Sequence, residues 1–436
     1  MGFQTGLSGL NASSKRMDVI GNNISNANTV GMKVSRTEFT ELVASALGPS
    51  GGGSRSGGGI GVAVGAITQQ FSQGTMNVTG NSLDVAINGG GFFEITQQDG
   101  TKAYTRDGQF KLTSDGDIVT NTGANLMGYP TDSLGVTTST LIQKLSVPTG
   151  APIPALATSE ITAEFNLDSR AKLGSTAVAP AVPVPIGTVG TTMTGYDAQG
   201  VPVSINLYFD KTSADKWDVY VPDPNIPAVT VPPTPLNPPV LLASMEFDAN
   251  GALIGTLDNT GTATATLGVV NMDLYSSNPN VNLASTPPGQ FSATLDLSRA
   301  TQYGTTFAVS SLTQDGYTAG NLTGVKISEQ GILTTTYSNG QTQARGQVSL
   351  ADFRNVQGLT PVGAGAWVET SASGQPVEGK PGNGNFGKLR AGATEDSNVD
   401  LTAELINMMT AQRDYQANAQ TIKTQDQVMS TLVNLR

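Results

Sequence analysis

The sequence predicts a mixed, mainly β protein with nested domains, in which a helix at each end of the chain encloses two outer β-rich domains. Three observations predict this class. Apolar residues recur at helical spacing only near the termini, apolar and polar residues alternate through much of the interior, and 15 of the 23 prolines lie between Pro148 and Pro239. A chain of 436 residues is long enough for several domains, at roughly 100–200 residues each.

The first predicted element is an N-terminal helix within residues 1–36. Its apolar positions alternate at spacings of four and three, the pattern of a helix that buries one stripe against a partner. We expect this stripe to lie in an interface between subunits. The interface positions expected on this helix are Leu7, Leu10, Met17 and Ile24.

The last predicted element is a C-terminal helix within residues 395–436. The same spacing continues along it and is interrupted only by Gln412 and Asp426. At 1.5 Å per residue, residues 398–436 would form a rod of roughly 58 Å. The interface positions expected on this helix are Leu401, Leu405, Met408, Tyr415, Ala419, Ile422, Met429 and Val433.

Each terminal helix is too long and one-sided to be stable alone in water, so its apolar stripe needs a partner. That partner is either the globular body of the same chain or other helices. Residues 1–36 carry a net charge of +3 and residues 395–436 a net charge of −3, and opposite charges favour pairing of the two ends within or between chains. Because no third helix is expected, we predict an inner coiled-coil-like bundle between copies.

Two stretches of the interior are expected to be linkers. Residues 37–70 include the glycine-rich run 51–59, which is typical of a flexible link. Residues 369–394 are expected to link the β domain to the C-terminal helix. The domains therefore lie between these two stretches.

A β domain in two parts, 71–145 and 292–368, is predicted from alternating apolar residues and turn dipeptides. A second β domain, 146–291, is inserted between the parts, because proline at its density excludes helices and central strands. The turns are expected at Asp99-Gly100, Asp107-Gly108, Asp115-Gly116, Asp315-Gly316 and Asn339-Gly340.

Composition excludes most catalytic chemistry. The sequence has no histidine and no cysteine, which removes histidine bases, cysteine nucleophiles, disulfides and zinc sites with these ligands. Charged residues make up 13% of the chain and the net charge is −11, so we expect no nucleic-acid binding, which depends on neutralising phosphates. We recognise neither a secretory signal peptide nor a membrane-spanning stretch, and expect no membrane insertion.

Three patterns that resemble known sites fail on their spacing or context. Residues 59–65 loosely resemble a dinucleotide-binding loop but precede no expected helix. Asp115-Gly116-Asp117 has Leu126 where a calcium loop needs its final glutamate. Carboxylates such as Glu94 and Asp99 have no context that marks a glycosidase. We therefore expect no catalytic residue, no metal site, no cofactor and no enzymatic activity.

The most informative segment lies near the N-terminus, where five asparagines occur between residues 11 and 28. Asparagine is a poor helix former, and a helix end with capping and turn positions explains each residue but not their concentration. The positions of interest are Asn22, Asn23, Asn26, Thr29, Gly31 and Lys33.

This segment resembles the N-terminal motif of the bacterial flagellar axial proteins of the rod and hook. The motif reads S-G-L-x-A, then N-N-I-x-N, then T-x-G-[F/M]-K, and Met32 stands where phenylalanine is commoner. Further stretches resemble the β-domain and C-terminal signatures of the family in the same order, over roughly half of the chain. These stretches are 80–93, 104–110, 384–387, 397–401 and 411–419.

Within that family the hook members are the best match. Rod members lack a sizeable middle insertion, junction members are longer, and residues 421–436 are similar to the endings of hook members. A distal rod protein is therefore the alternative within the family. From other classes, an extracellular adhesin or carbohydrate-binding protein, with the proline-rich domain binding the ligand, is the next hypothesis, and an enzyme is the third.

The resemblance implies a structural subunit that polymerises into a short curved tube, a universal joint between rod and filament. It implies self-association and contacts with the distal rod, hook cap and hook–filament junction proteins. It also implies export by the flagellar type III apparatus without a cleaved signal peptide, and a location in the hook and basal body of the flagellum, outside the cell.

Overall fold

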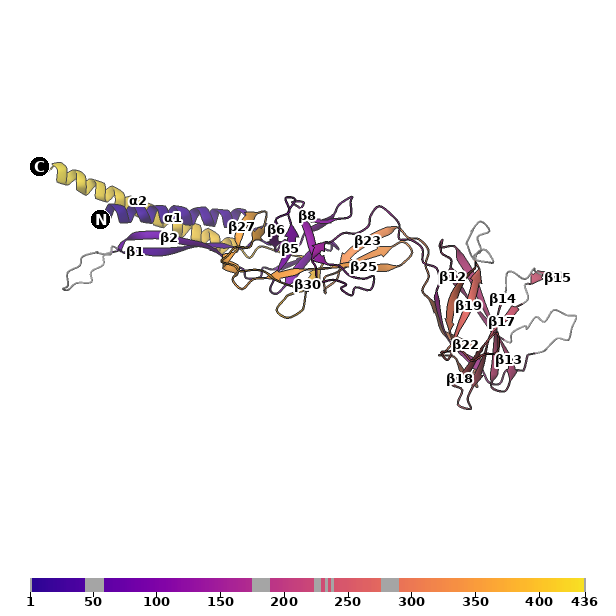
Figure 1. Cartoon of the computed structure of the whole chain (residues 1–436). Coiled ribbons are helices and arrows are strands. Elements are labelled where there is room, and N and C mark those ends of the chain that lie inside the picture. Colours follow the sequence, from indigo (N-terminus) through magenta and orange to yellow (C-terminus); the bar gives the residue numbers. More distant parts are fainter. Residues whose placement is uncertain are drawn as a thin grey trace. The chain divides into compact units, whose positions relative to one another are not determined.

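The computed structural model describes residues 2–43, 59–174, 189–222, 229–231, 234–236, 239–275 and 290–434 (Figure 1). The chain divides into two compact units. Unit 1 comprises Met1–Gly150, Thr323–Thr336 and Thr342–Arg436, and unit 2 comprises Ala151–Leu322 and Tyr337–Gln341. Strands dominate both units and the two long helices belong to unit 1, which confirms the predicted class.

The terminal helices are α1 (Gly2–Ser25) and α2 (Leu401–Asn434). Asp400 begins α2 as its N-cap, since its carboxylate accepts hydrogen bonds from the amides of Thr402 and Ala403 at 2.8 and 3.1 Å. The prediction of one helical segment over residues 1–36 is wrong in its second part. The chain turns after Ser25, and Gly31 adopts a φ of +71° that favours glycine.

Residues 37–70, predicted to be a linker, instead contain the antiparallel strands β1 (Ser35–Val43) and β2 (Gly59–Gln69). Most of the glycine-rich run 51–59 lies outside the described residues. The composition was misleading because glycine masks a strand pattern in β2, which also contains Val62, Val64 and Ile67. These two strands lie along α1 (Figure 1).

The rest of unit 1 consists of short strands that pair in several sheets. Its largest sheet has the order β23-β24-β25-β9-β5-β6-β28-β27, with β7, β8, β10, β26 and β29 pairing at its sides, while β3 pairs with β31 and β4 with β30. A one-turn 3₁₀ helix spans Val356–Gly358. The strands are β3 (Met76–Val78), β4 (Val85–Asn88), β5 (Phe92–Thr96), β6 (Lys102–Thr105), β7 (Phe110–Leu112), β8 (Ile118–Thr120), β9 (Asn125–Tyr129), β10 (Gln143–Lys144), β23 (Leu322–Ile327), β24 (Ile332–Tyr337), β25 (Thr342–Val348), β26 (Leu350–Asp352), β27 (Thr360–Gly363), β28 (Ala366–Val368), β29 (Val377–Gly379), β30 (Lys388–Ala391) and β31 (Ala393–Glu395).

Three of the five predicted turn dipeptides connect adjacent antiparallel strands. Asp99-Gly100 lies between β5 and β6, Asp115-Gly116 between β7 and β8, and Asn339-Gly340 between β24 and β25. The glycine has a positive φ in each, as such turns require. The predicted linker 369–394 is also corrected, because β29 and β30 within it pair with β26 and β4.

The core of unit 1 is aromatic and extends to the base of the β1–β2 pair. Trp367 and Phe92 pack edge to face with ring centroids 5.7 Å apart, and Phe71, just after β2, packs on Trp367 at 5.5 Å. The indole Nε1 of Trp367 donates a 2.6 Å hydrogen bond to the side-chain oxygen of Gln69. The end of β2 is thereby fixed to the core.

Unit 2 contains two five-stranded sheets. One has the order β19-β20-β11-β21 with β22 also paired to β11, and the other the order β12-β13-β14-β17-β18. The strands, which include a separate β15–β16 pair, are β11 (Glu160–Asp168), β12 (Val189–Tyr196), β13 (Pro202–Ser213), β14 (Lys216–Pro222), β15 (Val229–Val231), β16 (Thr234–Leu236), β17 (Pro239–Phe247), β18 (Leu253–Asp258), β19 (Val269–Tyr275), β20 (Gln290–Asp296), β21 (Thr301–Tyr303) and β22 (Ala308–Gln314).

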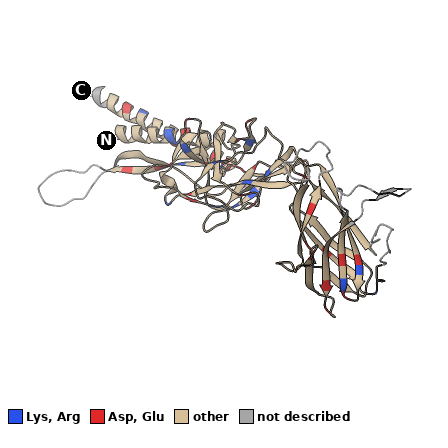
Figure 2. Cartoon of the chain, turned by 45° about the vertical axis from the view of Figure 1, so that its right-hand side comes forward, with Lys and Arg blue, Asp and Glu red and all other residues tan. Residues whose placement is uncertain are grey.

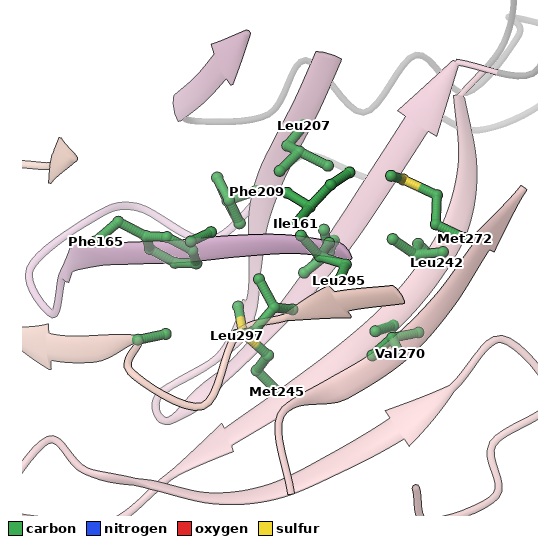
Figure 3. Packing of buried hydrophobic residues seen from close by; sticks show 14 of the residues in the cluster. Ile161, Phe165, Leu207, Phe209, Leu242, Met245, Val270, Met272, Leu295 and Leu297 are labelled. Atoms are coloured by element: carbon green, nitrogen blue, oxygen red, sulfur yellow. The ribbon is translucent and has the colours of Figure 1, made fainter. Parts of the chain in front are cut away.

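The core of unit 2 lies between these sheets (Figure 3). Ile161 and Phe165 from β11 meet Leu207 and Phe209 from β13, and the Phe165 and Phe209 rings are 4.5 Å apart between centroids. Alternate residues of β11 and β13 are buried, as expected for strands with one face on a core. Unit 2 is therefore a sandwich with its own hydrophobic core.

The inserted domain ends later than the predicted boundary at residue 291. Strands β20 to β22 belong to unit 2, because β20 pairs with β19 and β11, and β22 pairs with β11. The prediction failed because residues 292–322 alternate in the same style as the first β domain. Proline content marks only the earlier strands of unit 2.

A pH-dependent contact in unit 2 joins the end of β22 to the start of its neighbour β11. The Asp315 carboxylate accepts hydrogen bonds from the Ser159 hydroxyl at 2.5 Å and from the amides of Ser159 and Glu160 at 2.8 and 3.0 Å. Burial alone would raise the pKa of Asp315, but these hydrogen bonds outweigh it and hold the pKa below its usual value. Because the folded pKa is depressed, this stabilisation is present at neutral pH and is lost as pH falls.

We therefore expect Asp315→Asn to lower the free energy of unfolding of unit 2 by about 0.5–1 kcal/mol at neutral pH. The difference from the parent should shrink as pH falls below about 4, the ordinary pKa of an aspartate. Urea unfolding followed by Trp217 fluorescence, in a Trp367→Phe background, measures it. Glu160→Gln is the matched control, and a constant difference across this pH range would contradict the assignment.

Candidate functional site: paired terminal helices above a buried charge cluster

Helices α1 and α2 pack side by side (Figure 1), and the residues of α1 at the contact are small. The Ile422 side chain lies so close to Gly6 that its Cγ1 is 3.0 Å from where a Cβ would stand. The Asn418 side chain likewise lies 2.9 Å from the corresponding position at Gly9. Glycine therefore lets the two helices approach closely along this face.

Polar pairs continue the contact toward the base of the helices. Arg16 of α1 lies 3.6 Å from Asp414 of α2, and the Asn23 side chain donates a 3.2 Å hydrogen bond to Glu404. The opposite charges of the two chain ends thus form an ion pair between α1 and α2 of the same chain. Charged residues are otherwise sparse along both helices (Figure 2).

The apolar stripes predicted from the sequence lie beside this contact, and part of each stripe is exposed. Leu7 is 44% exposed, Leu405 is 52% exposed and Met429 is 61% exposed. Leu401 and Tyr415 are also exposed, whereas Leu10, Met17, Ile24, Met408, Ala419 and Ile422 are half-buried. The side chain of Val433 lies outside the described residues. That these positions contact other copies remains a prediction.

Apolar residues that the sequence analysis did not select extend the exposed surface. Ile406 and Met409 of α2 are 55% and 52% exposed, and Phe3 of α1 is 53% exposed. Phe39 and Ile67 of the β1–β2 pair are exposed as well. Together they leave a large apolar area without a partner in the described part of the chain.

Below the helices lies a group that we name the charge cluster, consisting of Lys33, Arg106 and Glu395. Lys33 and Glu395 are completely buried and Arg106 is 5% exposed. The Lys33 ammonium lies 2.5 Å from one oxygen of the Glu395 carboxylate, and Arg106 Nη1 lies 3.2 Å from the other. Burial lowers the pKa of Lys33, against the opposing effect of the hydrogen bond to Glu395, and burial likewise lowers the pKa of Arg106.

Two asparagines connect the charge cluster to the helices. Asn23 exchanges hydrogen bonds with the backbone of Ser35, where β1 begins. Asn398 accepts from the Val34 amide at 2.8 Å and donates to the carbonyls of Gln70 and Ser72. The end of α1, the base of the β1–β2 pair and the start of α2 are therefore bonded to one another.

The family-motif positions divide into two groups. Asn23, Gly31 and Lys33 take part in this buried junction, while Asn22, Asn26 and Thr29 form exposed hydrogen bonds at the end of α1. Sequence reasoning marked Lys33 but assigned no role to Arg106, Glu395 or Asn398. The only sequence signal for Arg106 and Asn398 was that they lie in segments 104–110 and 397–401, which carry the family resemblance. Glu395 lies in no such segment and had no signal.

The described residues contain no cluster of carboxylates that could hold a metal ion. Among the helices that the structure describes, none has an apolar run of the length needed to cross a membrane. Asp117, from the rejected calcium pattern, pairs with Lys144 at 2.9 Å. Residues 59–65, from the rejected nucleotide pattern, lie in β2.

Four family models match the chain in order from its N-terminus. They are "Flagella basal body rod protein" over residues 3–33, "Flagellar hook protein FlgE/F/G D1 domain" over 86–164, "Flagellar basal body protein FlaE D2 domain" over 166–317 and "Flagellar basal body rod FlgEFG protein C-terminal" over 390–435. The first and last models cover α1 and α2 with the motif residues. The third covers most of unit 2.

Relatives match over the whole length. The chain is 38% identical over 444 residues to the flagellar hook protein FlgE of Salmonella typhimurium strain LT2, and 38% identical over 444 residues to that of Escherichia coli K12, with 100% of both chains covered in each case. It is 32% identical to the flagellar hook protein FlgE of Rhizobium meliloti, over 100% of this chain and 98% of the relative. The crystal structure of the Helicobacter pylori flagellar hook protein FlgE2 has a similar fold, with a TM-score of 0.50 and 14% identity over 72% of this chain and 99% of that one.

Proposed function

Because this chain belongs to the flagellar hook protein family, we propose that its copies polymerise into a curved, flexible tube that joins the flagellar rod to the filament. The family consists of structural proteins of the flagellum, and the full-length identity of 38% includes the inserted domain. A distal rod protein, which would lack that insertion, is not supported. The observation that carries the proposal is the helix pair, whose outer faces expose apolar side chains along its length.

Exposed apolar residues on a helix pair need a partner, and copies of the same chain are the partner that a polymer supplies. The exposed residues of α1 and of α2 are different surfaces of one chain. A contact that joins one surface to a different one produces a ring if the rotation between copies closes, and an open helical array if it does not. Two different apolar surfaces on one chain therefore suit a repeated head-to-tail contact, and the similarity to flagellar hook proteins favours its open, tubular form.

The remaining parts of the proposal follow from the family. The tube would contact the distal rod, the hook cap and the hook–filament junction proteins at its ends. The subunit would travel to the growing end through the flagellar type III export apparatus and would stand outside the cell. As a universal joint, the tube would bend while it rotates, which requires contacts between copies that rearrange.

Electron microscopy of the purified full-length chain at increasing concentration tests the proposal. Tubes of constant diameter are expected above a critical concentration. Monodisperse particles at every concentration, together with retention on a carbohydrate matrix, would instead favour the adhesin hypothesis and overturn the proposal.

Hydrogen exchange on the same samples is expected to distinguish free from assembled chains. Residues 1–30 and 400–436 should exchange faster in the monomer than in the tube, because the outer apolar faces of the helix pair have no packing partner until copies assemble, and such helices are marginally stable. The core of unit 2 should be protected in both states and serves as the internal control. Strong protection of both termini in a demonstrably monomeric sample would contradict this expectation.

A further inference from the structure

The charge cluster joins four segments that are far apart in the sequence. The Glu395 carboxylate accepts hydrogen bonds from Lys33, from Arg106 and from the Gly74 amide at 2.9 Å, and the Glu395 carbonyl accepts from the Gly31 amide at 2.8 Å. Lys33 also donates to the Ser72 carbonyl at 2.8 Å. One buried residue thus holds the exit from α1, the connection between β2 and β3, the turn after β6 and the approach to α2.

The packing around the cluster is too close for the segments to slide. A Cβ at Gly31 would lie 2.6 Å from the Asp107 amide nitrogen, and a Cβ at Gly74 would lie 2.0 Å from the Asp396 carbonyl oxygen. Both glycines therefore permit backbone contacts that another residue would prevent. The charges are held in a rigid frame rather than in a loose pocket.

Stability alone does not explain this arrangement. Two cations face one anion, and Arg106 Nε is buried without a hydrogen-bond partner among the described residues. Buried ion pairs are often no more stabilising than apolar residues of the same volume, whereas removal of one partner is strongly destabilising. The planar guanidinium of arginine, however, adds geometric specificity, because its N–H donors point in fixed directions.

Resting on the proposed function, we propose that Lys33, Arg106 and Glu395 set the direction in which the helix pair leaves the β domain of unit 1, and so set the helical lattice of the tube. They are positioning residues, since none reaches the exposed faces of the helices. The effect of direction is large because α2 has 34 residues. At 1.5 Å per residue, a tilt of about 5° at its base displaces its far end by roughly 4 Å.

Two substitutions distinguish the effect of hydrogen-bond geometry in the charge cluster from the effect of its charges. Glu395→Gln keeps the shape of the side chain and removes the charge that both cations face. Arg106→Lys keeps the charge but loses the planar fork that bonds Glu395 and the Gly89 carbonyl together. The control is Arg36→Gln with Glu38→Gln, which removes an exposed ion pair in β1.

Three measurements are made on the full-length chain: thermal unfolding, the helical lattice of the tubes from electron micrographs, and hydrogen exchange at the Gly74 amide. Arg106→Lys should assemble at a critical concentration within about threefold of the parent, a change of under 1 kcal/mol, yet with an altered or mixed lattice. Glu395→Gln should speed exchange at Gly74 by about tenfold or more. The control should leave all three measurements unchanged.

A parental lattice in tubes of Arg106→Lys would overturn the proposal, whether or not Glu395→Gln folds. Failure of the proposed function gives a different result, because the parent itself would then form no tubes. In that case the cluster is judged by exchange alone. Unchanged exchange at Gly74 in Glu395→Gln would overturn its role as the junction, and accelerated exchange would support it.

Discussion

Ile422→Asp is expected to hinder assembly strongly while both β-rich units stay folded. Ile422 is half-buried and lies against Gly6, near the N-terminal end of α1 in the α1–α2 contact. An aspartate there would place a carboxylate in the half-buried contact with α1 and would remove the apolar contact. The two losses together weaken the pairing by about 2–3 kcal/mol.

The substitution should change the critical concentration for assembly far more than the thermal stability of either β-rich unit. Each copy contributes its helix pair to the polymer, so a loss of this size raises the critical concentration by about 30–140-fold. Sedimentation of tubes over a concentration series measures the critical concentration. Thermal unfolding followed by Trp217 and Trp367, which lie in the two β cores, measures whether the units remain folded.

Two further variants show which surface is responsible. Gln420→Asp introduces the same charge at an exposed position of α2 and should assemble within about threefold of the parent concentration. Leu405→Asp alters an exposed apolar residue away from α1 and should hinder assembly through contacts between copies. Normal tubes from Ile422→Asp at neutral pH, or a fall in β-core melting that parallels the loss of assembly, would contradict the interpretation.

Elements that depend on a few neighbouring residues were predictable from the sequence. Helical spacing identified α1 and α2, and the dipeptides Asp99-Gly100, Asp115-Gly116 and Asn339-Gly340 identified turns, because backbone preference acts over a few residues. The nested order of domains was predicted from proline density. The second boundary of the inserted domain was predicted wrongly. Residues 292–322 form strands of unit 2, but they contain too little proline to be distinguished from unit 1.

The contact between the helices was harder to predict. The apolar stripe of α1, which includes Leu7 and Leu10, suggested where its interface lies. Within the chain, however, α2 packs against Gly6 and Gly9, each of which precedes a stripe residue by one position. Small residues carry little hydrophobic signal, although they permit the closest approach between helices. The stripe with Leu7 consequently remains open for other copies, which is the arrangement that favours a bundle beyond the single chain.

The charge cluster could not be predicted at all. Lys33, Arg106 and Glu395 are separated by 73 and 289 residues (106 − 33 and 395 − 106), and only the folded structure brings them together. A lone lysine, arginine or glutamate in a sequence is ordinarily an exposed residue. Resemblance to a family marked two of the three residues but gave them no physical role.

Removal of most of unit 2 is expected to leave tube formation intact and to change the curvature of the tube. The helix pair, the β1–β2 pair and the charge cluster all belong to unit 1. The sequence placed the excision between Leu145 and Ser292, but Leu145 is buried in unit 1 and Ser292 lies in β20 of unit 2. The structure moves the junction to Ile153 and Gly320.

These two residues are already adjacent. The Ile153 amide donates a 2.8 Å hydrogen bond to the Gly320 carbonyl, and the Leu156 amide donates a 2.9 Å hydrogen bond to the Tyr317 carbonyl. Deletion of residues 154–319 with a short Gly-Ser linker therefore requires no movement of the flanking chain. Inserted domains commonly have neighbouring termini, which makes such excisions tolerable.

The change in curvature follows from what unit 2 would contribute to the polymer. A bent tube needs copies on its inner side to approach and copies on its outer side to separate, so contacts between copies of unit 2 must rearrange as the tube turns. A close-packed interface would resist this, whereas loosely packed, hydrated contacts can slide. Without them, nothing from unit 2 biases how far each row of copies compresses, and the tubes should straighten or adopt a different supercoil.

Tubes of the deletion variant are imaged beside those of the full-length chain and of a control in which the same Gly-Ser linker is inserted after Gly150 without a deletion. Straight or differently coiled tubes from the deletion variant alone would assign the curvature to unit 2. If the variant is folded and soluble yet forms no tubes, unit 2 takes part in assembly itself. If its tubes keep the parental curvature, the shape is set within unit 1, where the direction of the helix pair then becomes the determining quantity.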